Sequence, residues 1–345
     1  DEPPIARTFM IRPAYHPGPT RRLLSFAAAG LAALLCLPAQ AQTEAADYPA
    51  RNVTILVGFP PGTATDTVAR ILAERLAARL KKPFVIDNKP GQGGSLGAAA
   101  AAKAAPDGYT LLMSATAPMS INPHLYAKLT YDPQKDFAPI GLTSWLSYVL
   151  VVRPEFGVAT LSELLARARA NPGQISFASI GNGTTSHLLM TLLAQRTDTR
   201  FNHIPYKGSA QSQTDVMGGQ VDMTFDTLVS LMPHVKTGRL KALAVSSLNR
   251  SAFAPTVPTV AEQGVPGFDA GAWLGLLAPA GTPKPIVDKL NRELNQILEE
   301  PETRKKLIDA GTEILKSTPD EFVAHIRSEN VKWGKLVRES GARID

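Results

Sequence analysis

The chain has 345 residues, of which 44% are hydrophobic and 19% are charged, and its formal net charge is +6. This length is sufficient for two hydrophobic cores and favours two domains over one. Lysines and arginines are dispersed, and no basic run is interleaved with aromatic residues, so the composition argues against nucleic-acid binding. A mildly basic, solvated surface with some attraction for anions is the interpretation that remains.

The first 41 residues have the pattern of an export signal. Arg21 and Arg22 precede an apolar run over 23–37, and small residues of the kind that signal peptidase recognises follow it. We expect cleavage after Ala41 and interpret the residues before Met10 as an upstream extension. The apolar run is shorter than the roughly 20 residues of a spanning helix, so a soluble, exported protein is expected. The arginine pair resembles a twin-arginine signal, but nothing nearby requires folding before export, which favours the Sec route.

Cys36, the single cysteine, lies inside the apolar run. Leu35 precedes it where a lipid-anchored cysteine would require Gly, Ala or Ser, so we expect no lipid anchor. Cleavage after Ala41 leaves a mature chain without cysteine, which excludes disulfides and thiol catalysis. Cleavage also removes four arginines and two acidic residues, lowering the formal charge from +6 to +4.

Strands and helices are expected to alternate in the mature chain. Short apolar runs between turn residues predict strands at 53–59, 84–87, 109–113, 148–152, 175–178, 201–206, 221–226, 240–245 and 273–277. Helices are expected between several of these strands, and two more close the chain, with apolar faces over 286–297 and 322–337. This alternation predicts an α/β protein with mostly parallel sheets that helices cover on both faces.

The order of the elements also predicts a division into two lobes. The signal peptide and upstream extension occupy 1–41, the first lobe 48–144 together with 270–345, and the second lobe 145–269. The strand at 273–277 is interpreted as the return crossing into the first lobe. In such sheets, ligands bind beyond the carboxyl ends of the strands.

Two loops of similar design lie at such strand ends, one over 59–66 and the other over 179–187. Each is a loop rich in small residues that follows an apolar strand and opens into an amphipathic helix. A helix start of this kind presents unpaired N–H groups and the positive end of the helix dipole, and therefore binds anions. Thr63 with Asp66 and Thr160 with Glu163 also have capping-box spacing. Two anion sites in two lobes predict a clamp for a carboxylate.

Eight segments in order resemble one known family, and the resemblance runs from Tyr48 to Gly341. They are Phe59-Pro60-Pro61-Gly62 with Thr65-Asp66, Asn88-Lys89-Pro90-Gly91-Gln92-Gly93-Gly94, Pro106-Asp107-Gly108-Tyr109-Thr110-Leu111-Leu112, Asn122-Pro123-His124-Leu125-Tyr126, Tyr131-Asp132-Pro133-Gln134-Lys135-Asp136-Phe137-Ala138-Pro139, Gly181-Asn182-Gly183-Thr184, Pro205-Tyr206-Lys207-Gly208, and Leu276-Leu277-Ala278-Pro279-Ala280-Gly281-Thr282-Pro283. The chain resembles the Bug family, the TctC-type extracytoplasmic substrate-binding receptors of tripartite tricarboxylate transporters.

The resemblance implies a two-lobed periplasmic-binding-protein fold of type II, with two mostly parallel sheets, flanking helices and a hinge. It implies a periplasmic receptor, taken here as a monomer, that needs no cofactor and performs no catalysis. Such a receptor closes on a small carboxylate, which here means a di- or tricarboxylate, an acidic amino acid or an aromatic acid. The receptor then delivers this ligand to the membrane permease subunits of the transporter.

The residues that the resemblance assigns to ligand binding come from both lobes. The first lobe would contribute Phe59, Gly62, Thr63, Ala64, Thr65, Asp66, Thr116 and Ala117. The second would contribute Ser179, Gly181, Asn182, Gly183, Thr184, Thr185, His187, Tyr206, Lys207 and Asp226. Two positions depart from the family pattern, because Thr63 stands where a second glycine is frequent and Thr227 where Asn or Ser commonly follows the aspartate.

Several of these residues have a structural alternative. Asp66 is expected mainly to cap its own helix, since an acid in a carboxylate site repels the ligand. His187 is placed either against ligand or in a supporting position, because it begins a helix at the cleft. Lys207 acts either as an attractor for anions or as a solvated rim charge. Phe59 packs either on ligand or on its own lobe.

One motif suggests a different class of function. Gly93-Gly94-Ser95-Leu96-Gly97 matches G-x-S-x-G, and Asp226 with His234 or His325 follows in the order of an esterase triad. The nucleophile of such an enzyme stands at the very end of a strand, whereas seven residues, 88–94, separate Ser95 from the strand at 84–87. The dinucleotide fingerprint fits less well still, and the histidines show no metal-ligand spacing. A receptor that senses its ligand without transport is a further alternative.

Overall fold

The computed structural model describes residues 47–340 and 343. The predicted signal peptide, the cleavage position after Ala41 and Cys36 lie outside this range. The described helices include none that is both long and apolar enough to cross a membrane.

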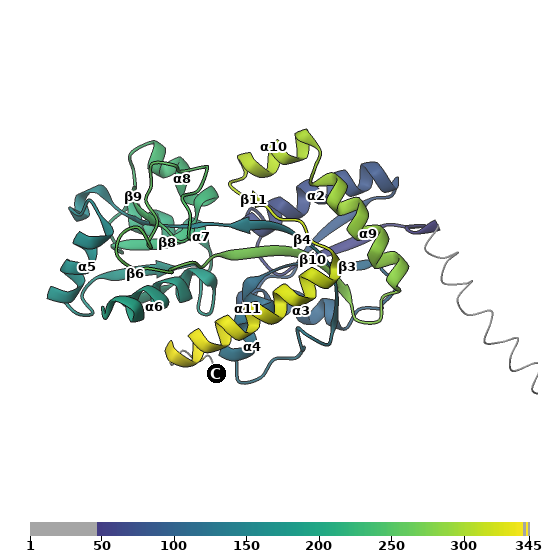
Figure 1. Cartoon of the computed structure of the whole chain (residues 1–345), viewed down its shortest axis with the longest axis horizontal. Coiled ribbons are helices and arrows are strands. Elements are labelled where there is room, and N and C mark those ends of the chain that lie inside the picture. The colour runs from purple at the N-terminus through teal and green to yellow at the C-terminus, as the bar shows by residue number, and fades with distance from the viewer. Residues whose placement is uncertain (1–46, 341–342, 344–345) are drawn as a thin grey trace, which may run out of the picture. The chain divides into compact units, whose positions relative to one another are not determined.

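A first sheet forms the centre of what we call lobe 1 (Figure 1). In the described part of the chain its order is β11-β4-β10-β3-β1-β2. The strands are β1 (Val53–Val57), β2 (Phe84–Asn88), β3 (Thr110–Ala115), β4 (Phe137–Leu146), β10 (Ala272–Pro279) and β11 (Glu313–Ile314). The helices of this lobe are α2 (Ala64–Leu80), η1 (Gln92–Gly94), α3 (Ser95–Ala102), η2 (Ala117–Ile121), α4 (Asn122–Leu125), α9 (Lys284–Ile297), α10 (Pro301–Asp309) and α11 (Pro319–Ser340).

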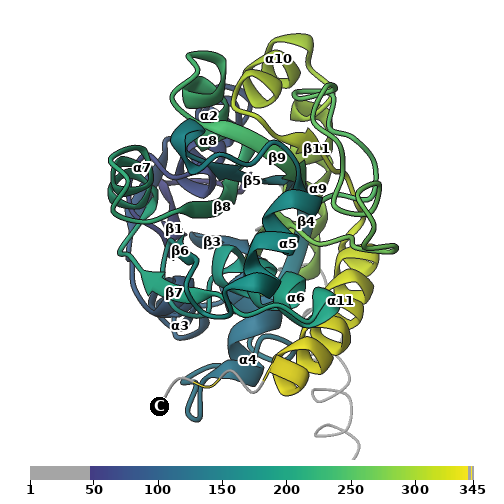
Figure 2. The ribbon, with the colours of Figure 1, turned by 90° about the vertical axis from the view of Figure 1, so that its left-hand side faces the viewer.

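A second sheet, in the order β7-β6-β8-β5-β9, forms the centre of lobe 2. Its strands are β5 (Tyr148–Val152), β6 (Ser176–Ser179), β7 (Asn202–Pro205), β8 (Met223–Thr227) and β9 (Lys241–Val245). Its helices are η3 (Pro154–Phe156), α5 (Leu161–Ala170), α6 (Thr185–Thr197), α7 (Ser209–Met217) and α8 (Leu228–Lys236). Figure 2 shows α5 and α6 on one side of the sheet and α7 and α8 on the other.

Both sheets are mixed, whereas the sequence predicted mostly parallel ones. β1 pairs in parallel with β2 and β3, and β6 pairs in parallel with β7 and β8. The remaining strands, β4, β5, β9, β10 and β11, pair antiparallel. The reason is that β4 and β5 carry the chain out of lobe 1 and β10 brings it back. β10, which enters the sheet of lobe 1, runs antiparallel to β3. β5, which enters the sheet of lobe 2, runs antiparallel to β8.

The two crossings lie side by side at residues that permit close packing. Leu146, at the end of β4, pairs with Ala272, at the start of β10. A Cβ atom on Gly271 would lie 2.7 Å from the ring of Trp145 and 2.8 Å from the carbonyl oxygen of Leu146, so this position accepts only glycine without rearrangement. Ser147 alone separates β4 from β5. These contacts form a compact double connection between the sheets.

Each lobe has its own hydrophobic core. In lobe 1, Leu56, Leu112 and Trp273 of the sheet pack with Phe322 of α11, and in lobe 2, Val149 of β5 belongs to a cluster with residues of α7 and α8. The threonine caps predicted at these helix starts are confirmed, but Asp66 and Glu163 accept from the amides of Gly62 and Ala159, one residue before the threonine, so neither capping box is complete. Thr63 Oγ1 accepts from the amide of Asp66, and Thr160 Oγ1 accepts from the amide of Glu163.

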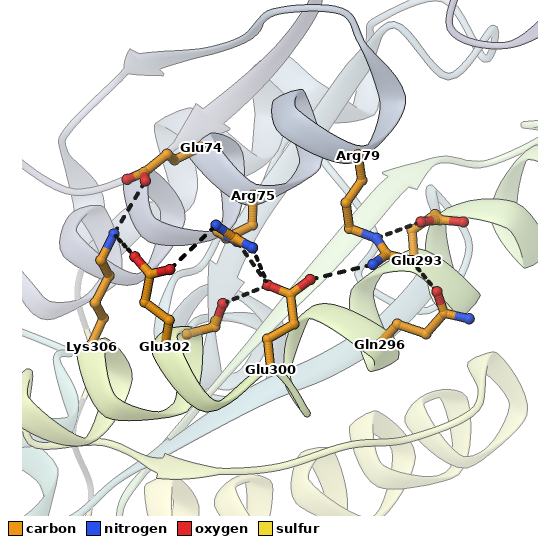
Figure 3. A network of polar contacts seen from close by, with 9 residues as sticks. Glu74, Arg75, Arg79, Glu293, Gln296, Glu300, Glu302 and Lys306 are labelled. Carbon is orange, nitrogen blue, oxygen red and sulfur yellow. Dashed lines mark hydrogen bonds and ion pairs between the residues drawn. The ribbon is translucent and has the colours of Figure 1, made fainter.

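A network of polar contacts joins α2 to α9 and α10 (Figure 3). Arg75 bonds Glu300 at 2.7 Å, and Arg79 bonds Glu293 at 2.7 Å, which joins α2 to α9 and to the residue before α10. Lys306 of α10 lies 3.1 Å from a carboxylate oxygen of Glu74. Ion pairs of this exposure contribute little one by one, but several together define one position for the helix. The network thereby connects the C-terminal half of α2 to α9 and α10.

Candidate ligand-binding cleft

Three adjoining cavities lie where residues of the two lobes meet. The central one has a volume of about 50 Å³, and the two wider ones have volumes of about 440 Å³ and about 620 Å³. Thr63 of lobe 1 and Ser209 of lobe 2 line all three cavities. The three therefore form one cleft, with a narrow centre and two wider arms.

Four helices begin at the central cavity. Its wall includes Thr63 before α2, Thr184 before α6, Ser209 at the start of α7 and Thr227 before α8. Each helix start carries partial positive charge, and its first N–H groups have no acceptor within the helix. The arrangement brings one start from lobe 1 and three from lobe 2 to the same small space.

Three of these four helix starts lack a side-chain cap. The side chains of the N-cap residues Thr184, Gly208 and Thr227 accept no hydrogen bond from the backbone amides of the helices that they precede. Leaving helix amides without partners is unfavourable unless water or a ligand satisfies them. Because residues at these helix starts line a shared cavity, the geometry suits an anion with several acceptor oxygens, although the first amide of α8, that of Leu228, already donates to the carbonyl oxygen of Ser147 at 3.0 Å.

The two predicted loops have nearly the same conformation. Thr63 has φ −73° and ψ 162°, and Thr184 has φ −75° and ψ 160°. Each threonine hydroxyl donates to the carbonyl oxygen three residues earlier, that of Pro60 at 2.9 Å and that of Gly181 at 2.7 Å. The similar design inferred from the sequence is therefore a similarity of backbone geometry.

The glycine amides of the two loops are not free for a ligand, which corrects the sequence expectation. The amide of Gly62 donates to Asp66 Oδ2 at 2.9 Å, and that of Gly183 donates to His187 Nδ1 at 3.2 Å. Both glycines have positive φ, +81° and +74°, so they turn the chain without strain. The donors left for a ligand are the amides at the helix starts that follow.

Asp66 has the supporting role that capping predicts. Its carboxylate is buried and accepts from Arg70, Gly62 and Asn88. Burial disfavours the charge, but these hydrogen bonds outweigh it and lower the pKa of Asp66 below its usual value. Asp66 lines none of the three cavities.

Thirteen of the eighteen predicted site residues line the cleft. They are Phe59, Gly62, Thr63, Ala64, Thr65, Ala117, Gly181, Asn182, Thr184, Thr185, Tyr206, Lys207 and Asp226. The other five, Asp66, Thr116, Ser179, Gly183 and His187, lie behind the lining residues. Thr116, for example, accepts from the amide of Trp273 at 2.8 Å.

The sequence did not single out the starts of α7 and α8. Ser209 and Thr227 line the cleft, together with Gln211, Val229 and Ser230 in one wide arm. The signal for α7 was present, because Gly208-Ser209 follows a strand and precedes a helix, as the loops at Thr63 and Thr184 do. The other wide arm is lined by the glycine-rich turn of η1 and by Tyr126.

The sequence of the chain is similar to those of known proteins. The model of the family described as "Tripartite tricarboxylate transporter family receptor" matches residues 68–342. The chain belongs to this family of receptors. It is 38% identical to Protein BugT of Bordetella pertussis over 92% of this chain and 95% of that protein. It is also 38% identical to the UPF0065 protein in the tcbD-tcbE intergenic region of Pseudomonas sp. strain P51, over 85% of this chain and 87% of that protein.

Solved structures of the same kind agree with the fold. The Rhodopseudomonas palustris proteins Rpa4515 with adipate and MatC with bound malate give TM-scores of 0.82 and 0.78 at 32% and 34% identity. These comparisons cover 86% and 84% of this receptor and 100% of each structure. The periplasmic binding protein BugD gives a TM-score of 0.79 at 36% identity, covering 86% of this receptor and 99% of that structure.

One acidic side chain of the receptor faces the central cavity. Asp226 is 1% exposed, and it accepts from the amide of Thr227 at 2.7 Å and from Gln213 at 3.3 Å. Burial raises the pKa of Asp226, although hydrogen bonds from Ser209, Thr227, Gln213 and Ser230 oppose the rise. These donors absorb the negative charge of Asp226, which weakens its repulsion of an anionic ligand.

Ser95 of the receptor has no esterase geometry. Its hydroxyl is buried, lies 3.1 Å from Tyr131 Oη and accepts from Asn122 Nδ2 at 2.7 Å. Ser95 lines none of the three cavities, and its hydroxyl has no histidine partner among the described residues. The side chain therefore anchors the glycine-rich turn. Among the residues that the structure describes, no cluster of metal-ligating side chains occurs.

Proposed function

We propose that this receptor captures a small carboxylate in the periplasm by closing its two lobes, and that it delivers the ligand to permease subunits of a tripartite tricarboxylate transporter. The observation that carries the proposal is the meeting of four helix starts, three of them uncapped, at one central cavity. Neutral N–H donors hold an anion without a buried counter-ion. Membership of the receptor family supports the same conclusion.

The division of donors between lobes supplies the closing force. Lobe 1 contributes the start of α2, and lobe 2 contributes the starts of α6, α7 and α8. A ligand favours closure only through contacts that improve in the closed state, and contacts to two lobes meet this condition. The crossings at Ser147 and Gly271 are the proposed hinge. We propose lobe boundaries at these two crossings, within three residues of the positions 144–145 and 269–270 expected from the sequence.

The charges of the cleft narrow the class of ligand. Lys207 is the one cationic side chain that lines the three cavities formed by the described residues, and Asp226 the one acidic side chain. A tricarboxylate would place three negative charges opposite a single cation. The geometry therefore favours a dicarboxylate whose first carboxylate enters the narrow centre and whose second lies near Lys207. The adipate of Rpa4515 and the malate of MatC are ligands of this class in relatives.

The required affinity is attainable with such contacts. A micromolar dissociation constant corresponds to roughly 8 kcal/mol. Charge-assisted hydrogen bonds contribute roughly 1.5–3 kcal/mol each. Several of them therefore suffice for micromolar affinity after the free-energy costs of desolvation and lobe closure are subtracted. No bond-making chemistry is required.

Thermal unfolding with matched ligands tests the proposal. Adipate and malate are added to separate samples, with hexanoate and 3-hydroxybutyrate as the corresponding monocarboxylates. A ligand that binds only the native state raises the melting temperature, and the rise grows with ligand concentration. We expect at least one dicarboxylate to stabilise the receptor more than its monocarboxylate partner does. Equal or absent stabilisation by all carboxylates would contradict the proposed ligand class.

A further inference from the structure

In each of the two anion-binding loops, a side chain accepts a hydrogen bond from a loop glycine, and we call this bond the brace of the loop. The two braces occupy equivalent positions but differ in chemistry. In each loop the glycine amide before the N-cap threonine donates to the side chain three residues after that threonine. In lobe 1 the acceptor is Asp66, a carboxylate that Arg70 also bonds. In lobe 2 the acceptor is His187, an imidazole.

His187 is held in turn by a stack of rings. The rings of His187 and His203 are parallel within 7°, with centroids 4.0 Å apart, and Phe177 stacks on His203 at 4.7 Å. His203 Nε2 lies 2.6 Å from Ser179 Oγ, and the same hydroxyl bonds Gly181 at the start of the loop. The stack thus contacts the loop at both of its ends.

We infer that His187 and His203 are positioning residues that hold loop 181–184 with its helix amides directed into the cleft, and that acid releases this loop before the loop of lobe 1. Nδ1 of His187 accepts a hydrogen bond, so its proton sits on Nε2. Protonation turns Nδ1 into a donor, which faces the N–H of Gly183 and breaks the brace. The centroids of His187 and His203 are 4.0 Å apart, so once one ring is protonated its charge repels a second charge on the other ring.

The surroundings of the two rings favour the neutral forms. Burial lowers the pKa of His187 to about 4, and burial together with the neighbouring His187 lowers that of His203 to about 3. Among the described residues, the other partners that the rings stack on or bond, Phe177, Ser179 and Gly183, carry no charge. Asp66 behaves in the opposite way, because its lowered pKa keeps it ionised, and the brace intact, as the pH falls.

The size of the pH effect on loop opening follows from the difference in pKa between a released and a stacked His187. A released His187 has a pKa near 6.5, so each pH unit between about 6.5 and 4 favours the released loop roughly tenfold. From pH 7 to pH 4.5 the opening equilibrium of loop 181–184 should therefore rise on the order of 50-fold. The equivalent loop over 60–63 should change little over the same range, because Asp66 does not titrate there.

Hydrogen exchange at these two pH values tests the inference, with the two loops compared in the same ligand-free sample. After correction for intrinsic exchange rates, we expect opening of the peptide around 181–184 to rise at least 20-fold and opening of the peptide around 60–63 to change less than threefold. Because no ligand is present, this test can fail while the proposed function stands, and the reverse also holds.

Two variants sharpen the test. His187→Gln keeps a neutral acceptor near Gly183 and should reduce the pH response of loop 181–184 to less than threefold. His203→Phe keeps an aromatic ring on His187 but loses the bond to Ser179, so the loop should already open more at pH 7. An equal response of both wild-type loops would overturn the inference even if the variants failed to fold. A full response in folded His187→Gln would overturn it as well.

Discussion

Replacement of Asp66 by Asn tests the support beneath the first anion-binding loop. The Asp66 side chain is 3% exposed, and its oxygens accept from Gly62, Arg70 and Asn88, with four donor–acceptor distances of 2.9 Å. An asparagine presents an NH₂ group to some of these donors and leaves them without an acceptor. Loss of a buried acceptor costs about 1–3 kcal/mol. The ion pair adds little, because Arg70 is 52% exposed.

We therefore expect Asp66→Asn to lower the free energy of unfolding by about 2 kcal/mol at pH 7, or roughly 3 °C in melting temperature for a protein of this size. Asp288→Asn is the matched control. Asp288 also forms an ion pair four residues away, with Lys284 at 2.7 Å, but both side chains are exposed. Its replacement should change stability by less than about 0.5 kcal/mol.

The pH dependence of the same comparison has a definite sign. The pKa of Asp66 is lower in the folded receptor than in the unfolded chain, so its contribution is complete above the unfolded value near 4 and is lost as the pH falls through the folded value. Thermal unfolding of wild type and Asp66→Asn should therefore converge below about pH 4. Equal stability of the two proteins at pH 7, or a loss as large in Asp288→Asn, would refute the reasoning.

Three further predictions concern the cleft and its surroundings. Lys207→Met should weaken adipate binding about tenfold and leave hexanoate binding unchanged in calorimetry, since one ion pair is lost; equal effects on both ligands would exclude the proposed role. Ser95→Ala should lower stability by about 1–2 kcal/mol without changing adipate affinity, and a large affinity loss would contradict a purely anchoring side chain. A Cβ atom on Gly311 would lie 2.7 Å from that of Val229, so Gly311→Ala should hold the lobes apart and increase the radius of gyration in X-ray scattering. Gly173 has the same φ of +74°, but a Cβ atom there would meet no atom within 4 Å, so the control Gly173→Ala should leave the radius of gyration unchanged.

Much of the fold could be predicted because its strands are short apolar runs between clear turn residues. The strand at Tyr148–Val152 was predicted with its observed bounds. β4 (Phe137–Leu146) was missed because Pro139 and Gly141 interrupt its apolar pattern, and both residues suggest a loop. The structure accommodates them through register shifts against β10. The mixed character of the sheets was missed for a different reason: β5 and β10 were predicted as strands, but their antiparallel direction depends on how the chain crosses between the lobes.

The site could be predicted only where the backbone pattern is local. Thr63 and Thr184 each follow a strand and precede a helix, and this order alone places them at strand ends. His203 could not be found in this way, because its role depends on stacking against a residue sixteen positions away on another element. Nor does the sequence show that the glycine amides are already bonded to Asp66 and His187.

A crystal structure of the receptor grown with adipate tests the central claim most directly. We expect one carboxylate in the central cavity, with its oxygens about 3 Å from amides at the starts of both α2 and α6. A carboxylate bound outside that cavity, or held by side chains of one lobe alone, would contradict it.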